Sequence, residues 1–510
     1  MTEIDFCHVV EKKILYLTLA VASTCSLADV SESSVQPTSP ATTSTAAVVN
    51  NSNASFIGRY NYFQNPYGWM LSGGGTSKLT ESEIKEQNWA EKLFAGGTYN
   101  VFTGVTYNQW DGQYASSGKS YGANVFAQTG QLRGFSIGGV LSIMDPIGSF
   151  NDAVVNPITP GVPNRYSSYY IPTYTSNTLS EGFLEYQYSN IVNADIGYVA
   201  FDNSPWLAGN MYTNMLTVPT TYQGVGVNVY AGSGWVLSAL GFNAAQFGAQ
   251  QGFTGQTNYS SWLQMKNGAS NGTNGTVALG AQYTDASGNY NTRIWGYQFD
   301  NYGTLLYGDG SINFPIASSK NVLKVAAQFG TDQQWLQGSN AINQSIGGGN
   351  IQSYVGGVQV GWSYSTMWQL NLSANTMWGA SGSYNGGAFV SPYTQSLQVD
   401  PLYSEAWSYN MVTTGQPGNM YKVQGQFGLG SWGQNLIFQP SYVYVGNNNP
   451  TTNGLQELDL VLNYPLPQVR GLYLFGVYAQ QWYNPNAAPA GLPDNNYQPI
   501  EIQSGVYYTW

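Results

Sequence analysis

The residues that usually carry covalent or metal chemistry are confined to the first 25 positions of this chain. Its only cysteines are Cys7 and Cys25, and its only histidine is His8. A Ser-His-acid enzyme needs a histidine base, and a zinc site needs cysteine or histidine ligands. The rest of the chain depends on carboxylates, amines, amides and hydroxyl groups. We therefore expect no enzymatic activity, no metal and no cofactor.

The first 28 residues have the organisation of a secretory signal peptide. Two lysines precede an apolar stretch over residues 14–22, and a small-x-small pattern ends at Ala28. Three of the 26 acidic and two of the 15 basic residues lie in this segment, so 23 acidic and 13 basic residues remain. Such a balance disfavours nucleic-acid binding. A lipoprotein site at Cys25 is the alternative, although Ala22 and Thr24 fit it poorly.

Composition separates a short arm from one long domain. Residues 29–54 are rich in Ser, Thr, Pro, Ala and Asn and predict a disordered arm. No second linker interrupts residues 55–510, which we interpret as one domain. Only 8% of all residues are charged, against about 25% in average soluble proteins. No apolar run reaches 18 residues, so we expect no helical membrane span in this domain.

Strands with one apolar and one polar face recur through this domain. In "MWQLNLSANTMW", alternate residues from Trp368 to Trp378 are apolar or aromatic with one threonine, and Gln369 to Asn375 supply polar residues between them. Ten steps of about 3.3 Å, tilted by about 40°, cross about 25 Å, the height of the apolar band of an outer-membrane barrel. The expected membrane-interface aromatics are Trp368, Trp378, Tyr508 and Trp510.

Hydrocarbon offers no partners for open sheet edges, so a spanning sheet must close. We predict an all-β fold, a transmembrane antiparallel β-barrel of 16–20 strands with 18 preferred. Soluble sandwiches, propellers and β-helices also contain alternating strands and are the alternatives. The polar faces would line the interior, where the expected pore-lining residues are Glu185, Asp195, Lys324, Lys422, Glu457, Asp459 and Glu501.

The stretch that starts "ADIGYVAFDNSPWLAGNMYTNM" and continues through "VPTTYQGVGV" resembles OprD-type porins of Gram-negative bacteria. "RYNYFQN" and "VRGLYLFGVYAQQWY" are similar to further parts of the same family. The resemblance implies an 18-stranded channel for small polar solutes, with residues 202–218 folded inward as a constriction. A surface turn at "FDNSPW" is the alternative. The implied constriction residues are Asp202, Asn203, Trp206, Asn210, Tyr212 and Asn214.

The sequence departs from that family in its few arginines. OprD-type channels guide carboxylates along a ladder of arginines. Beyond residue 28 this chain has only five, namely Arg59, Arg133, Arg165, Arg293 and Arg470. Because acidic side chains in a pore favour cations, a cation-preferring or neutral-solute pore is as well supported as a carboxylate channel.

We therefore expect an exported outer-membrane porin for passive diffusion. Its partners would be membrane lipids, small polar solutes or ions, and the barrel-assembly machinery, which would read the aromatic last strand ending "VYYTW". A homo-oligomer is compatible with the sequence. One alternative is a structural or adhesive barrel whose long loops bind a partner. A carboxylate-pair glycosidase would need an apolar pocket that the sequence does not reveal.

Overall fold

The structure is a computed structural model. It describes residues 93–94, 97–111, 116–148, 175–189, 191–201, 204–207, 220–246, 252–255, 273–316, 320–334, 350–365, 367–393, 401–409, 411–414, 417–428, 436–447, 453–466, 469, 472–483 and 500–509. All of these belong to one compact unit, Asn50–Trp510. The predicted signal peptide (1–28) and arm (29–54) lie outside the described residues.

Eighteen strands make up almost all of the described secondary structure. The first nine are β1 (Thr98–Asp111), β2 (Ser116–Gln128), β3 (Phe135–Pro146), β4 (Ser176–Tyr188), β5 (Val192–Val199), β6 (Thr221–Gly232), β7 (Trp235–Gln246), β8 (Thr276–Thr284) and β9 (Tyr290–Phe299). The second nine are β10 (Gly303–Pro315), β11 (Asn321–Gln333), β12 (Gln352–Tyr364), β13 (Trp368–Gly379), β14 (Gly418–Gly428), β15 (Ile437–Asn447), β16 (Gln456–Pro465), β17 (Leu472–Trp482) and β18 (Ile500–Thr509).

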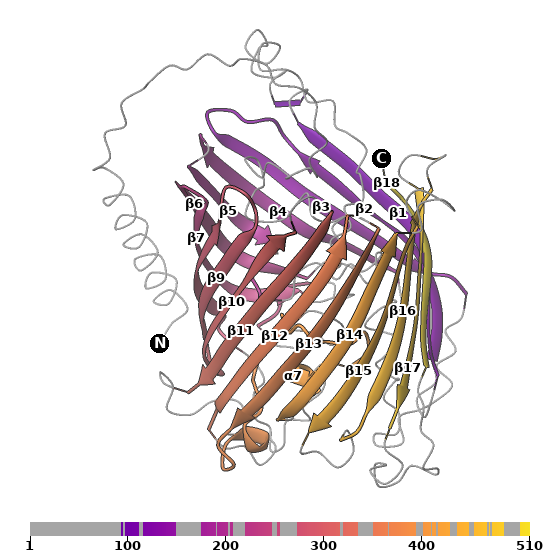
Figure 1. Ribbon diagram of the computed structural model, residues 1–510. Coiled ribbons are helices and arrows are strands. Elements are labelled where there is room, and N and C mark those ends of the chain that lie inside the picture. The colour runs from indigo at the N-terminus through magenta and orange to yellow at the C-terminus, as the bar shows by residue number, and fades with distance from the viewer. Residues whose placement is uncertain are drawn as a thin grey trace, which may run out of the picture. The chain divides into compact units, whose positions relative to one another are not determined.

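Each strand pairs antiparallel with the next in the sequence, and the ring closes between the first and the last (Figure 1). In that closing pair, Phe102 lies opposite Thr509 and Asp111 lies opposite Ile500. Closure gives both edge strands a hydrogen-bonding partner, as a sheet in hydrocarbon requires. The predicted antiparallel barrel of about 18 strands is confirmed.

The alternation of side chains along β13 shows which face points outward. Leu370, Leu372 and Trp378 are 42%, 51% and 43% exposed, whereas Ser373 and Asn375 between them are buried. The same rule holds around the ring, so the outside of the barrel is apolar and the inside carries most of the polar side chains. Further exposed apolar side chains include Ile137, Ile196, Ile294, Phe329, Val358 and Val506.

Short turns connect several strands at one end. Between β6 and β7 the backbone turns through Gly234 with φ of 86°. A Cβ atom there would lie 1.8 Å from the carbonyl oxygen of Thr284, so only glycine fits this position.

Helix is scarce in the described part of the chain. Between β13 and β14 lie the one-turn 3-10 helix η5 (Tyr384–Gly386) and the short helix α7 (Met411–Thr414). No described helix has both the length and the apolar character to cross a membrane. The connection from β13 to β14 instead places residues inside the barrel, where the candidate site lies.

Candidate functional site in the barrel interior

Two parts of the β13–β14 connection contact inward-facing strand residues. Residues 388–393 are named insert 1, and residues 401–409 are named insert 2. The backbone N–H of Val390 in insert 1 donates to Asp332 of β11 at 2.9 Å. The backbone N–H of Trp407 in insert 2 donates to Asp459 of β16 at 3.3 Å. Both inserts therefore occupy the space that the ring of strands encloses.

Insert 1 packs into an aromatic cluster on the inner wall. Phe389 stacks on Trp206, with ring centroids 4.9 Å apart. Tyr393 meets Tyr222 at 5.9 Å and Phe242 at 5.0 Å, both in edge-on contacts. All of these rings are buried. Insert 1 is thus stabilised by the burial of its aromatic rings away from water.

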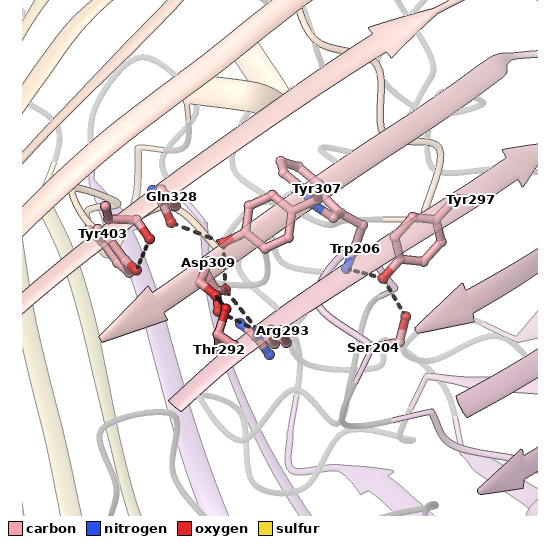
Figure 2. Close-up of polar contacts among 10 residues, drawn as sticks. Ser204, Trp206, Thr292, Arg293, Tyr297, Tyr307, Asp309, Gln328 and Tyr403 are labelled. Carbon is pink, nitrogen blue, oxygen red and sulfur yellow. Dashed lines mark hydrogen bonds and ion pairs between the residues drawn. The ribbon is translucent and has the colours of Figure 1, made fainter. Parts of the chain in front are cut away.

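The segment before β6 joins the same cluster. The hydroxyl groups of Ser204 and Tyr297 lie 2.8 Å apart, and the N–H of Trp206 donates to the Tyr297 hydroxyl at 3.4 Å. The Trp206 ring also meets Tyr307 edge-on at 5.5 Å (Figure 2). The structure therefore places Trp206, one of the predicted constriction residues, inside the barrel. The other five, Asp202, Asn203, Asn210, Tyr212 and Asn214, lie outside the described residues.

A polar network borders the aromatic cluster on β9, β10 and β11. Arg293 Nε donates to both carboxylate oxygens of Asp309, at 3.0 and 2.8 Å. Tyr307 donates its single hydroxyl proton to Asp309 at 2.8 Å. It then accepts from the Gln328 amide at 3.0 Å, and the same amide donates to the carbonyl of Pro401 at 2.8 Å. Figure 2 shows the contacts that join Arg293, Asp309, Tyr307 and Gln328. The backbone N–H of Tyr403 in insert 2 donates to the Gln328 amide oxygen at 3.1 Å.

Three of the predicted pore-lining carboxylates converge on insert 2. Glu457 accepts from the backbone N–H of Ser408 at 2.5 Å and from Gln481 at 2.8 Å. Asp459 accepts from Ser441 at 2.8 Å in addition to Trp407. Glu501 accepts from the Ser408 hydroxyl at 2.8 Å. The sequence indicated the inward direction of these side chains, but it did not reveal that they bind another segment.

The remaining predicted pore-lining residues also lie on the inner faces of their strands. Glu185 and Asp195 are direct cross-strand partners, and Glu185 accepts from Gln128 at 3.0 Å. Lys422 donates to the carbonyl of Glu405 in insert 2 at 2.7 Å. Lys324 is partly exposed on β11.

Two of the four predicted interface aromatics, Trp368 and Trp378, lie at the ends of β13. Trp368 packs against Trp362 at 5.8 Å, and Trp378 stacks with Tyr354 at 5.7 Å. Trp510 lies outside the described residues, as does the side chain of Tyr508, whose backbone belongs to β18.

Neither insert was predicted from the sequence. The one available signal is aromatic content, because Phe389, Tyr393, Tyr403, Trp407 and Tyr409 follow one another in a connection where turn residues are expected. Among the described side chains, no group of three or more metal-ligating residues is placed to hold an ion.

Comparison with solved structures supports the architecture. No family model matches the sequence, and no curated protein matches it. Solved structures do match. The outer membrane protein OpdK of Pseudomonas aeruginosa aligns with a TM-score of 0.60 and 14% identity, over 82% of this chain and 99% of that one. OccAB2 of Acinetobacter baumannii gives a TM-score of 0.62 and 13% identity over the same shares. The chain has the OprD-type porin fold.

Two of the matching structures were solved with small acids. OpdK was solved with vanillate, and OccK2 (OpdF) of Pseudomonas aeruginosa was solved with glucuronate. The OccK2 complex aligns with a TM-score of 0.59 and 12% identity, over 82% of this chain and 98% of that one. At sequence identities this low, the similarity shows a shared OprD-type barrel fold and nothing about the solute.

Proposed function

We propose that this protein is an outer-membrane channel for passive diffusion of small polar solutes, narrowed by inserts inside the barrel. The observation that carries the proposal is the difference in polarity between the outer and inner faces of one closed sheet. The outer face is an apolar belt, whereas the inner face carries most of the polar side chains together with an aromatic cluster, and both parts contact the inserts. A ring of 18 strands is too wide for strand side chains alone to fill.

Hydroxyl, amide and carboxyl groups on the inner face bond to one another. On β2, β3 and β4, Ser142 donates to Asn124 at 2.6 Å and lies 2.7 Å from Ser180. On β1, Asn108 donates to Glu501 at 3.3 Å. Such groups would be costly on a surface facing lipid, so they support the assignment of this face to the inside of the channel.

The solute class is inferred from the charges on this inner face. Arg293 is the only arginine on a described inward strand face, and its guanidinium is already bonded to Asp309. The Lys422 ammonium is bonded to the backbone of insert 2. Free arginines that could bind an acidic solute are therefore scarce on the described wall. We infer a channel for neutral or cationic polar solutes, in contrast to the acids found with OpdK and OccK2.

The proposal includes the surroundings of the barrel. Membrane lipids would cover the apolar outer face, and the assembly machinery would read the last strand. We propose a channel without enzymatic activity. A purely adhesive barrel would not need inserts bonded across its interior, so the channel is favoured.

Single-channel recording in a planar lipid bilayer tests the proposal. The purified, folded protein should produce discrete current steps. In a salt gradient, the sign of the reversal potential should indicate a preference for cations. Inserted, folded barrels that pass no current would contradict the channel and favour the adhesive alternative. Current steps with an anion-selective reversal potential would contradict only the inferred solute class.

A further inference from the structure

Insert 2 bridges distant strands of the ring. Tyr403 donates to the backbone of Ala327 in β11 at 3.1 Å, and Ser408 donates to Glu501 in β18. These two strands are seven steps apart in a ring of 18. The residues between them bind strands in order, with Ser404 on Asn375 of β13 at 2.9 Å and Trp407 on Asp459 of β16. Insert 2 therefore lies across the inside of the barrel from one part of the wall to another.

The two inserts differ in their main contacts. Insert 1 is fixed by stacked aromatic rings and by one hydrogen bond, from the Val390 N–H to Asp332. Insert 2 is fixed at its Ser408 end by hydrogen bonds to carboxylates, since the Ser408 N–H reaches Glu457 and its hydroxyl reaches Glu501. Water competes for these hydrogen bonds once they are exposed, whereas it does not compete for apolar contacts.

We infer that Glu457, Asp459 and Glu501 are positioning residues that hold insert 2 across the lumen and thereby set the size of the channel. This inference rests on the proposed channel function. It assigns the three carboxylates a role other than direct contact with the solute. Their shared target is the short Trp407–Ser408 stretch, where three separate donors meet three separate carboxylates.

The decisive variant changes insert 2 and leaves the strands untouched. Ser408→Pro removes both the backbone N–H that Glu457 accepts and the hydroxyl that Glu501 accepts. Ser408→Ala removes only the hydroxyl, and Ser408→Thr keeps both donors as a matched control. Loss of these two hydrogen bonds should raise the undocked fraction of insert 2 by at least about tenfold. Glu501→Ala removes one acceptor from the wall side.

Two readouts distinguish this inference from the channel proposal. The first is single-channel current, which should become larger or switch between new levels in Ser408→Pro and stay unchanged in Ser408→Thr. The second is labelling of a buried thiol, introduced as Ser404→Cys, by a water-soluble methanethiosulfonate. The chain has no other cysteine beyond residue 25, and Ser404 is fully buried. Labelling should be at least about tenfold faster with Ser408→Pro.

Each outcome decides one claim. Faster labelling together with altered current supports the inference. Equal labelling rates in Ser408→Pro and Ser408→Thr overturn it, whether or not the protein conducts. Faster labelling with unchanged current overturns the claim that insert 2 sets channel size. If the unaltered protein passes no current, the channel proposal fails and labelling still decides the docking of insert 2. Ser408→Ala and Glu501→Ala should have non-additive effects if they break the same bond.

Discussion

Neighbouring residues on β13 offer a direct test of which face meets lipid. Leu372 points outward and is 51% exposed, and Asn371 beside it points inward. Arginine can be placed at either position at nearly the same depth. Leu372 lies four residues from Trp368 and six from Trp378. With a rise of about 3.3 Å and a tilt of about 40°, it lies about 10 Å from one aromatic end and about 15 Å from the other. It is therefore near the middle of the apolar belt.

The expected difference between the two variants is large. A lipid-facing arginine near the midplane of an outer-membrane barrel costs about 2–4 kcal/mol. Leu372→Arg should lower the free energy of unfolding by this amount, a factor of about 30 to 800 in the folding equilibrium. Asn371→Arg places the same charge on the inner face, where polar groups surround it. Its cost should be within about 1 kcal/mol.

Urea titration of the protein refolded into lipid vesicles measures both free energies of unfolding. Migration of the unheated protein on a denaturing gel reports the folded barrel independently. The reasoning predicts that Leu372→Arg is clearly the less stable variant. Equal losses in the two variants, or a larger loss for Asn371→Arg, would show that the assigned inner and outer faces are wrong.

Three further predictions concern the interior and one turn. Trp206→Ala removes the ring stacked on Phe389 at a cost of about 3–5 kcal/mol of local packing, so single-channel currents should be larger and noisier; unchanged currents would place this cluster away from the path. Asp309→Asn leaves the Arg293 guanidinium without its counter-ion, so the reversal potential should shift toward anions and return when Arg293→Gln is added; no shift would mean that Arg293 does not face the conducting water. Hydrogen bonds from the Ser287 hydroxyl and the Tyr290 N–H lower the pKa of Asp285 in the β8–β9 turn. Protection of the Tyr290 amide from hydrogen exchange should therefore persist below pH ~3.9, disappear as the pH falls through the lowered pKa, and lose this dependence in Asp285→Asn.

Alternation along single strands, together with the low charge and the aromatic strand ends, predicted the fold. It predicted the facing of side chains where one face of a strand is polar, but not over residues 470–483, which are apolar on both faces. In β13 and β16 a lipid-facing residue follows each inward residue, so Leu372 and Glu457 could be assigned to opposite faces from their positions alone. This works because the period of two is fixed by backbone geometry. Closure into a ring followed from the need to pair both edges.

The interior arrangement could not be predicted in the same way. Insert 2 has no periodic pattern, and its position depends on bonds to residues far away in the sequence. Ser408 meets Glu457 and Glu501 across 49 and 93 positions of the chain. A sequence shows that a carboxylate faces inward, but not which donor it accepts from. For the same reason Trp206 could be placed inside only by its resemblance to a constriction loop.

The central claim is that a hydrated bore, narrowed from within, passes through this barrel. Single-channel current measured with added polyethylene glycols of increasing size tests it most directly. The account predicts discrete current steps that the smallest polymers reduce and the largest leave unchanged, because only small polymers enter the narrowed bore. Folded, membrane-inserted protein that gives no current steps at any applied voltage would contradict it.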